Sequence, residues 1–501
     1  MSKSIVRYPP LESGYGLSPA RLPGDLDTNM STNADRRAAA DVRAREAFGA
    51  DYLDLAFPSI AAAAEIEAQR HDLLEELCEQ VPSTCSGTKI AGALSPGCAI
   101  CAAGKWSCLF INECCNARCF YCPTSQDRVG EPMTNGVPFS KTEEYLEYLA
   151  RFGFSGVSIS GGEPLMTLDR TLDYLTAIRR RFGEGMHTWL YTNGTLLDAS
   201  VVRRLRDAGL DEIRFDIGAT NYSLDKVPLA VGVIQHVTVE LPAIPEDLET
   251  LTAKLAPMSE LGVDFLNLHQ LRLTPHNLPQ MIARGYTFAH GEQITVLDSE
   301  VTALRVLAQV AREKLSLAVN YCSFLYKSRF QGAAARRRGA QILCRPHEDV
   351  TASGYIRQLR VTGSEAEIAA LAARLNTTSS LPDSWSVRGE ELTFVAALWP
   401  LVQPQTWRFS VAYTTPCIVP AVRYRHPFIE IPLGGQRKIA AERVPSGPAI
   451  DLSVAHTESY FCRYLSSDTE GASVGVPLGD DSFFEQLHRY ECIEDGLQDY
   501  Y

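Results

Sequence analysis

The sequence contains no apolar run long enough to cross a membrane. No stretch approaches the roughly 20 consecutive apolar residues that a membrane helix needs. Residues 1–23 are polar, contain four prolines and lack the basic-then-apolar layout of a secretory signal. These absences predict a cytoplasmic protein with no membrane partner.

An excess of positive charge is also missing. The chain carries 47 Lys and Arg against 60 Asp and Glu, which gives a net charge of −13. This balance argues against broad nucleic-acid binding by phosphate neutralisation. Otherwise the composition is ordinary, with 45% hydrophobic and 21% charged residues among 501, so the chain can build more than one folded domain.

The sequence contains 14 cysteines, and they are unevenly spread along the chain. Nine of them lie between Cys78 and Cys122. Disulfides are rare in the cytoplasm, so clustered cysteines there are expected to be buried, metal-bound or catalytic. The region around residue 100 is therefore the first candidate for function.

From residue 106 onward, short apolar runs alternate with amphipathic helical segments. This alternation predicts an α/β fold in which a parallel sheet carries helices on its outside. Six strand–helix units indicate an open, partial (β/α)6 barrel. The six predicted strands are 106–111, 157–160, 188–192, 212–217, 236–241 and 265–271, with a further strand possible at 317–321 and a helix at 298–313.

Capping residues mark the starts and ends of two of these helices. Ser140 with Glu143 matches a capping box, in which a serine and a glutamate close the first helical turn. Asp198 stands at the start of the helix that follows strand three, and Gly209 stands where this helix should end. We therefore expect helices to begin close to residues 140 and 198.

The chain divides into four predicted parts. Residues 1–84 form an N-terminal arm, to about residue 30, and a helical extension; 85–105 form a Cys-rich lead-in loop. Residues 106–345 form the barrel. The texture changes again near residue 350, where strand-like runs at 355–361, 392–398 and 408–413 mix with a helix at 366–375, so 346–501 are predicted to be a separate α+β accessory domain.

The clearest chemical motif is C-x3-C-x2-C, formed by Cys115, Cys119 and Cys122. Three thiolates at this spacing can fold around a cubic iron–sulfur cluster and leave its fourth iron open to a small molecule. A zinc loop is the alternative, but zinc normally takes four ligands and no histidine lies between His71 and His187. The spacing therefore favours a cluster over zinc.

A second motif falls at the same end of the predicted barrel. The cysteines follow the first strand, and the second strand ends in Gly161, Gly162, Glu163 and Pro164. The carboxyl ends of barrel strands carry the active site. Paired glycines allow backbone to approach a ligand closely, and the Glu163 carboxylate is expected to meet an ammonium group.

Together these motifs resemble those of the radical S-adenosylmethionine (radical SAM) superfamily, over about residues 106–275. The resemblance implies that Cys115, Cys119 and Cys122 bind a [4Fe-4S] cluster whose fourth iron is chelated by S-adenosylmethionine. It implies that Gly161, Gly162, Glu163 and Pro164 meet the methionine amino group. It places Tyr121 near the adenine and, more weakly, Asn193 and Asp216 near the cofactor.

The resemblance also implies a reaction. The cluster would receive an electron from a low-potential donor such as flavodoxin or ferredoxin and cleave S-adenosylmethionine. The resulting 5′-deoxyadenosyl radical would abstract hydrogen from a substrate that the sequence does not identify. A non-canonical cleavage that transfers an aminocarboxypropyl group uses the same motifs and stays open. An iron–sulfur electron carrier or a zinc-structured binding module is a more distant alternative.

Three further segments, 210–215, 264–268 and 321–327, loosely resemble an uncharacterised branch related to pyruvate formate-lyase activating enzymes. The long C-terminal half departs from those enzymes, which argues against a glycyl-radical activase.

The lead-in loop suggests a second metal site. Cys98 and Cys101 form a C-x2-C pair that could bind a second iron–sulfur cluster together with the distant Cys322 and Cys344. Buried free thiols are the alternative. His269 and His276, which follow the sixth strand, could meet substrate or transfer protons, and structural histidines are the alternative.

Overall fold

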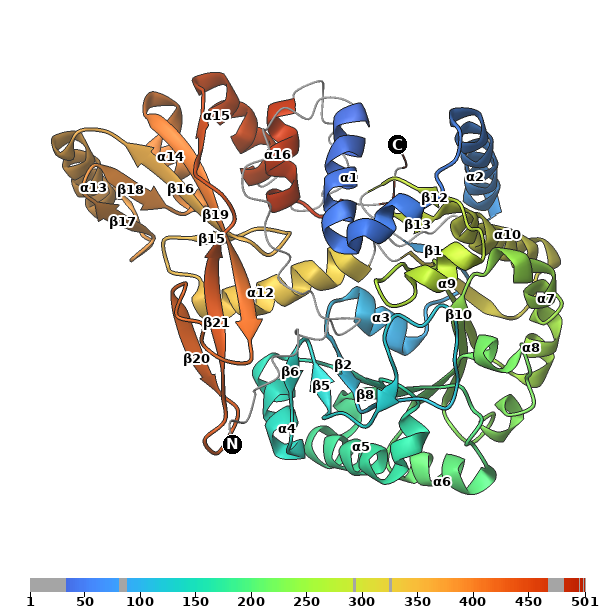
Figure 1. The fold of residues 1–501 in the computed structure, drawn as a ribbon. Coiled ribbons are helices and arrows are strands. Elements are labelled where there is room, and N and C mark those ends of the chain that lie inside the picture. The colour runs from blue at the N-terminus through green and yellow to red at the C-terminus, as the bar shows by residue number, and fades with distance from the viewer. Residues whose placement is uncertain are drawn as a thin grey trace, which may run out of the picture.

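The structure is a computed structural model that describes residues 33–80, 88–291, 294–323, 327–466, 482–494, 496–498 and 500. The arm predicted over residues 1 to about 30 lies outside this description. A barrel-like α/β region stands beside a C-terminal sheet (Figure 1). Within the described residues, no helix combines the length and apolarity that membrane crossing would require.

Seven parallel strands form the barrel wall. All six predicted strands are confirmed, and the further strand near residue 320 adds a seventh at the far side. Neighbouring strands pair in parallel in the order in which they follow one another along the chain. They are β2 (Trp106–Phe110), β7 (Gly156–Ser160), β8 (His187–Thr192), β9 (Glu212–Phe215), β10 (His236–Pro242), β11 (Phe265–His269) and β14 (Ala318–Cys322).

Alternation along each strand separates the barrel interior from the helical layer. Leu190 and Ile213 face outward and join the large apolar core under the helices. Trp189, Tyr191 and Arg214 line the interior instead. The covering helices are α4 (Thr142–Arg151), α5 (Leu168–Phe182), α6 (Ala199–Asp207), α7 (Leu248–Thr252), α8 (Leu255–Leu261) and α10 (Leu297–Glu313).

One predicted cap is confirmed and the other is wrong. Asp198 caps α6 by accepting hydrogen bonds from the backbone N–H groups of Ser200 and Val201, and Gly209 follows this helix with φ +96°. Helix α4 begins two residues later than Ser140, at Thr142, without a side-chain cap. The Ser140 hydroxyl donates instead to Glu131, 3.0 Å away, so it is not free to close the helix.

The prediction of a loop over residues 85–105 is wrong, because the described residues of this segment contain a strand and a helix. Strand β1 (Thr88–Ala91) pairs antiparallel with β14, and helix α3 (Pro96–Ala102) follows it. The Ser95 side chain caps α3, and Pro96 begins it. The order of this segment comes from a partner strand more than 200 residues away, which no local pattern reveals.

Helix α3 fills the interior of the barrel. The backbone N–H of Gly97 donates to Glu212 of β9, and Ile100 lies against Gly156 at the start of β7. A side chain at Gly97 would stand 2.4 Å from the Arg214 guanidinium, so only glycine fits this contact. Figure 1 shows α3 beside β2 and β8.

The N-terminal helices cover two sides of the barrel. Helix α2 (Ile60–Gln80) lies alongside α10 (Figure 1). Helix α1 (Asn33–Phe48) and the turn η1 (Gly49–Asp54) contribute Ala44 and Tyr52, respectively, to an apolar cluster against which Phe120 and Tyr121 also pack. The extension therefore shields the segment that carries the cysteine motif.

An antiparallel sheet forms the C-terminal region. Its main path runs β17 (Trp385–Arg388), β18 (Glu391–Phe394), β16 (Ile356–Thr362), β19 (Arg408–Val419), β21 (Lys438–Pro445) and β20 (Phe428–Pro432). Its helices include α13 (Glu365–Thr378), α14 (Trp399–Val402), α15 (Val454–Tyr460) and α16 (Ser482–Glu491). Ile431 and Ile439 join the barrel core, and α12 (Gly332–Leu343) packs on β19 and β21, so the two regions share a packed boundary.

Candidate functional site

A short hairpin holds the cysteine motif at the carboxyl end of β2. Strands β3 (Glu113–Cys114) and β4 (Asp127–Arg128) pair antiparallel, and the N–H of Cys115 donates to the Gln126 carbonyl at 3.2 Å. The twelve residues from 115 to 126 thus form a loop closed at its base. The predicted position of the motif at the mouth of the barrel is confirmed.

The three motif thiols are half-buried and influence one another. Burial raises the pKa of Cys119 to about 12, with negative charge on Asp216, Cys122 and Cys115 acting in the same direction. Burial likewise raises the pKa values of Cys115 and Cys122. Three thiolates in such a place need a bound positive charge, because without one their repulsion and desolvation keep them protonated. The donor set therefore fits an iron–sulfur cluster.

The described residues contain no three His, Cys, Asp or Glu side chains arranged as ligands of a single metal ion. In a cubic cluster each thiolate binds its own iron, so the ligand sulfurs stand farther apart than around one ion.

Gly161 and Gly162 are required by close backbone packing against the base of the cysteine loop. A Cβ on Gly162 would lie 1.8 Å from the Cys114 carbonyl oxygen, and one on Gly161, whose φ is +123°, would lie 2.3 Å from that of Asn112. The N–H of Glu163 donates to the same Cys114 carbonyl at 2.7 Å. The glycine pair thereby fixes the cysteine loop to the end of β7.

Asn112 connects these two segments, and the sequence reasoning missed it. Its side-chain oxygen accepts from the N–H of Gly162, and its amide nitrogen donates to the Glu163 carbonyl at 3.0 Å. It is fully buried. Its place two residues after β2 is the one available signal, and that signal is weak without a known partner.

Protein donors hold the Glu163 carboxylate in place, and its contact with an ammonium group stays a prediction. The side chain is 1% exposed and accepts three hydrogen bonds, from the N–H of Leu165, the hydroxyl of Thr192 and the N–H of Asn193, at 3.1, 2.8 and 2.7 Å. It points into the protein because β8 supplies two of these donors.

Asn193 lies beside the first motif cysteine. Its Nδ2 stands 3.8 Å from Cys115 Sγ and donates to Asn116 Oδ1 at 2.8 Å. Because Glu163 holds the Asn193 backbone, the second motif reaches Cys115 through this residue. Pro164 begins a buried turn, and its carbonyl accepts from Thr171, so it shapes the backbone after Glu163.

Tyr121 and Asp216 are hydrogen-bonded to each other across the mouth. The phenol lies 2.9 and 3.0 Å from the two carboxylate oxygens. Burial raises the pKa of Asp216 to about 6, against the lowering effect of its hydrogen bonds. The Tyr121 carbonyl also accepts from Asn277 Nδ2 at 3.1 Å, so the loop after β11 supports the cysteine loop, a contact that the sequence did not predict.

Of the four cysteines predicted to form a second site, three line one cavity and the fourth does not. Cys98 and Cys101 of α3 and Cys322 of β14 face this cavity inside the barrel. Cys344 follows α12, and its thiol lies 3.5 Å from the Glu348 carbonyl. The predicted four-cysteine set is therefore wrong in Cys344, because α12 carries this residue toward the C-terminal sheet.

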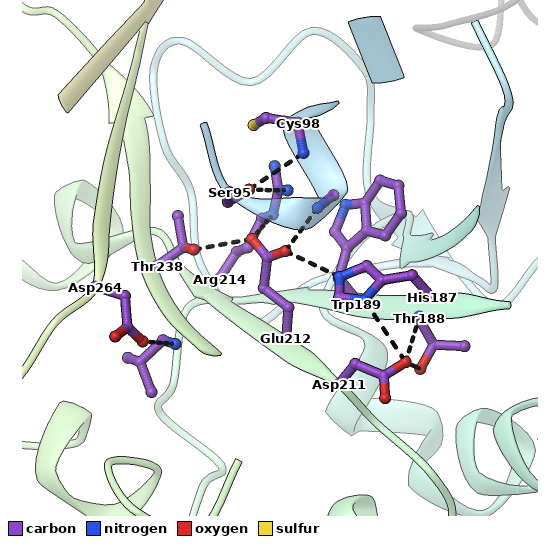
Figure 2. Close-up of polar contacts among 12 residues, drawn as sticks. Ser95, Cys98, His187, Thr188, Trp189, Asp211, Glu212, Arg214, Thr238 and Asp264 are labelled. Atoms are coloured by element: carbon purple, nitrogen blue, oxygen red, sulfur yellow. Dashed lines mark hydrogen bonds and ion pairs between the residues drawn. The ribbon is translucent and has the colours of Figure 1, made fainter. Parts of the chain in front are cut away.

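A charged network lies in the barrel interior, and Figure 2 shows its part around Glu212 and Arg214. Arg214 pairs with Glu212 at 2.8 Å and with Glu240 at 2.6 Å, and its other nitrogen donates to Ser95. Glu212 also contacts His187 at 3.2 Å and accepts from Thr238. Although burial opposes ionisation, these partners lower the pKa of Glu212 to about 2.

Comparison with known proteins agrees with this geometry. A family model described as the radical SAM superfamily matches residues 109–228. A Methanocaldococcus jannaschii protein with the provisional name glycyl-radical enzyme activating enzyme is 30% identical over 292 residues, which cover 56% of this chain and 76% of that protein. A GTP 3′,8-cyclase of Aliarcobacter butzleri is 29% identical over 111 residues, which cover 22% of this chain and 33% of the cyclase.

A solved structure is also similar to part of this chain. It is a radical S-adenosylmethionine methyltransferase of Kitasatospora setae with cobalamin and a [4Fe-4S] cluster bound, at 16% identity and a TM-score of 0.26, covering 36% of this chain and 40% of that one. On the strength of the family model and the Methanocaldococcus relative, the chain belongs to the radical SAM superfamily, whose enzymes use a [4Fe-4S] cluster and S-adenosylmethionine.

Proposed function

We propose that this enzyme binds its cluster through Cys115, Cys119 and Cys122 and cleaves S-adenosylmethionine reductively. The bound cluster and cofactor supply the hard chemistry, a 5′-deoxyadenosyl radical that removes a hydrogen atom from the substrate. The single observation that carries this proposal is the packing of Gly161–Gly162 against the base of the three-cysteine loop. That packing joins the three-cysteine loop to the end of β7 at one barrel mouth.

The chain's own residues would hold the cluster, orient the cofactor and shield both from water. Asn193, placed by Glu163, donates toward Cys115 and would steady the first thiolate. Tyr121 and Asp216 form an acceptor-rich wall that would orient the hydroxyl groups of the cofactor ribose. Phe120 and Tyr121 pack with residues of the N-terminal extension, which keeps water from one side of the loop.

The substrate class of the relatives does not transfer directly. The match to the cyclase covers a third of its length, and the long C-terminal sheet lies outside the matched family model. The provisional name of the Methanocaldococcus relative supports hydrogen abstraction as the reaction type. A flavodoxin or ferredoxin is the class of donor we expect to deliver the electron.

Product analysis tests the proposal. Anaerobically reconstituted enzyme, reduced in the presence of S-adenosylmethionine, should form 5′-deoxyadenosine and methionine. The variant Cys119→Ala should form neither, and Cys462→Ala, a change at an exposed cysteine, should behave as wild type. If methylthioadenosine is the product instead, the enzyme transfers an aminocarboxypropyl group and the proposal is wrong. A reducible cluster that leaves S-adenosylmethionine intact would indicate an electron carrier.

A further inference from the structure

The barrel interior contains a cavity between α3 and the carboxyl ends of β11 and β14. His269 and Cys322 are the last residues of those strands and line it, so it reaches the end of the barrel that carries the cysteine loop. Its volume is about 430 Å³ including the part open to solvent, and its narrow interior admits a water-sized group. It can take a small polar group but not a nucleotide.

One residue that lines this cavity carries an acceptor without a donor. Asn320 of β14 is 4% exposed, and its Nδ2 donates to Asn267 Oδ1 at 3.2 Å. Its own side-chain oxygen is buried and accepts no hydrogen bond from a described residue. A buried carbonyl left in this way costs about 1–3 kcal/mol, which a ligand N–H or O–H would recover.

The fixed charges around the cavity are unequal. Glu212 and Glu240 are both buried, and one guanidinium, that of Arg214, stands between them. Glu240 also accepts from Asn267 at 3.0 Å and contacts His269, and His187 contacts Glu212. Asp216 lies near enough for Glu240 to raise its pKa. Two carboxylates thus face a single permanently charged guanidinium, and in a low-dielectric interior this arrangement favours a cation as the missing donor.

Glu163 and Asp216 do not account for this arrangement. Neither carboxylate lines the cavity: Glu163 accepts from Leu165, Thr192 and Asn193, and Asp216 faces Tyr121 at the mouth. Asn320 and Glu240 lie in the same interior row, joined through Asn267, which contacts both. The cavity is therefore a separate acceptor site below the proposed cofactor site.

We propose that this cavity binds the protonated amino group of the substrate, so that the enzyme acts on a primary amine. The ammonium group would donate to Asn320 Oδ1 and pair with Glu240, and the carbon chain would extend past His269 toward the mouth. This inference rests on the proposed function and narrows its substrate to amines.

Binding of a small amine tests the site without needing the natural substrate. Ethylammonium chloride, acetamide and ethanol are titrated into cluster-loaded enzyme with S-adenosylmethionine, without reductant and at matched ionic strength, and affinity is measured calorimetrically. Ethylammonium should bind more tightly than either neutral probe. Glu240→Gln and Asn320→Leu should each weaken it about tenfold, which is the loss expected for one charge-assisted hydrogen bond.

Matched controls repeat the same chemical changes on the surface. Glu249→Gln and Asn376→Leu alter exposed helical positions and should leave ethylammonium binding unchanged. Asn320→Asp keeps an acceptor and adds negative charge, so it should bind the amine at least as tightly as wild type even if Asn320→Leu fails to fold.

Equal affinity of the wild type for ethylammonium and acetamide would overturn the proposal, as would full affinity in folded Glu240→Gln. Formation of 5′-deoxyadenosine is measured separately in the same preparations. Normal cleavage without amine binding would overturn the amine site alone, whereas amine binding without cleavage would overturn the proposed function and leave a binding site.

Discussion

The cysteines at the barrel mouth and those in the barrel interior are built in opposite ways. Cys115, Cys119 and Cys122 lie within one loop, closed by the two-residue ladder of β3 and β4. The interior set joins α3 to β14, and the contacts of α3 reach partners such as Gln331, 230 residues along the chain. A site built by one loop can be read from spacing, while a site built across the fold depends on pairing that spacing does not encode.

Removing the loop thiols should produce the largest effect. The triple variant Cys115→Ala, Cys119→Ala and Cys122→Ala should fall from about four iron atoms per chain to almost none after reconstitution. Cys98→Ser should keep about four, because no four-cysteine set forms inside the barrel. Iron analysis and electron paramagnetic resonance measure both. About eight irons in the wild type, or about four in the triple variant, would show that a second cluster exists.

Gly162→Ala should disrupt the packing of the glycine pair against the base of the cysteine loop. The new Cβ would lie 1.8 Å from the Cys114 carbonyl, so backbone must shift, at a cost of about 1–3 kcal/mol or more. Thermal unfolding should begin at a lower temperature, and cluster content should fall. Gly185→Ala is the matched control, since no atom lies within 4 Å of its added Cβ. Similar losses in both variants would contradict the packing argument.

Asp216 should make stability depend on pH. Burial raises its pKa from 3.8 to about 6. A carboxyl with a raised folded-state pKa stabilises the fold when protonated, and this contribution declines as pH rises from about 4 through 6, by about 2–3 kcal/mol. Urea unfolding of wild type and Asp216→Asn should show the variant gaining relative stability between pH 4 and 7. Parallel pH profiles would refute the shifted pKa.

Cys344→Ala should have the smallest effect. The thiol lies near backbone carbonyls outside the interior cavity, so iron content should not change and the free energy of unfolding should fall by less than about 1 kcal/mol. Cys322→Ala, at a buried position that lines the cavity, is the paired variant. A change in iron content in Cys344→Ala would place this residue back among the cluster ligands.

Sequence patterns within a single segment predicted the strands, one helix cap and the cysteine loop, because contacts within that segment determine these features. The seven strands follow from apolar runs, and the cap at Asp198 follows from a side chain that bonds its own helix. The cysteine loop and the glycine pair follow from spacing at strand ends. These features need no knowledge of which strand lies beside which.

Most of what the sequence did not predict involves partners distant in sequence, although Ser140 fails as a cap because it bonds Glu131, nine residues away. Thr192 and Asn193, from the next strand, turn the Glu163 carboxylate inward. β14 orders the lead-in segment, and α12 removes Cys344 from the interior. The Asn320 oxygen is notable only because the folded barrel leaves it without a donor.

The pairing of β1 with β14 constrains the order of assembly on the ribosome. Synthesis proceeds from the N-terminus, so Thr88 emerges long before Cys322, the residue opposite which it finally lies. Until β14 is made, the segment that places α3 has no edge to join. The cysteine loop, closed by its own hairpin, can be complete while the barrel interior is still open, so loading of iron and sulfide can precede closure around the cavity.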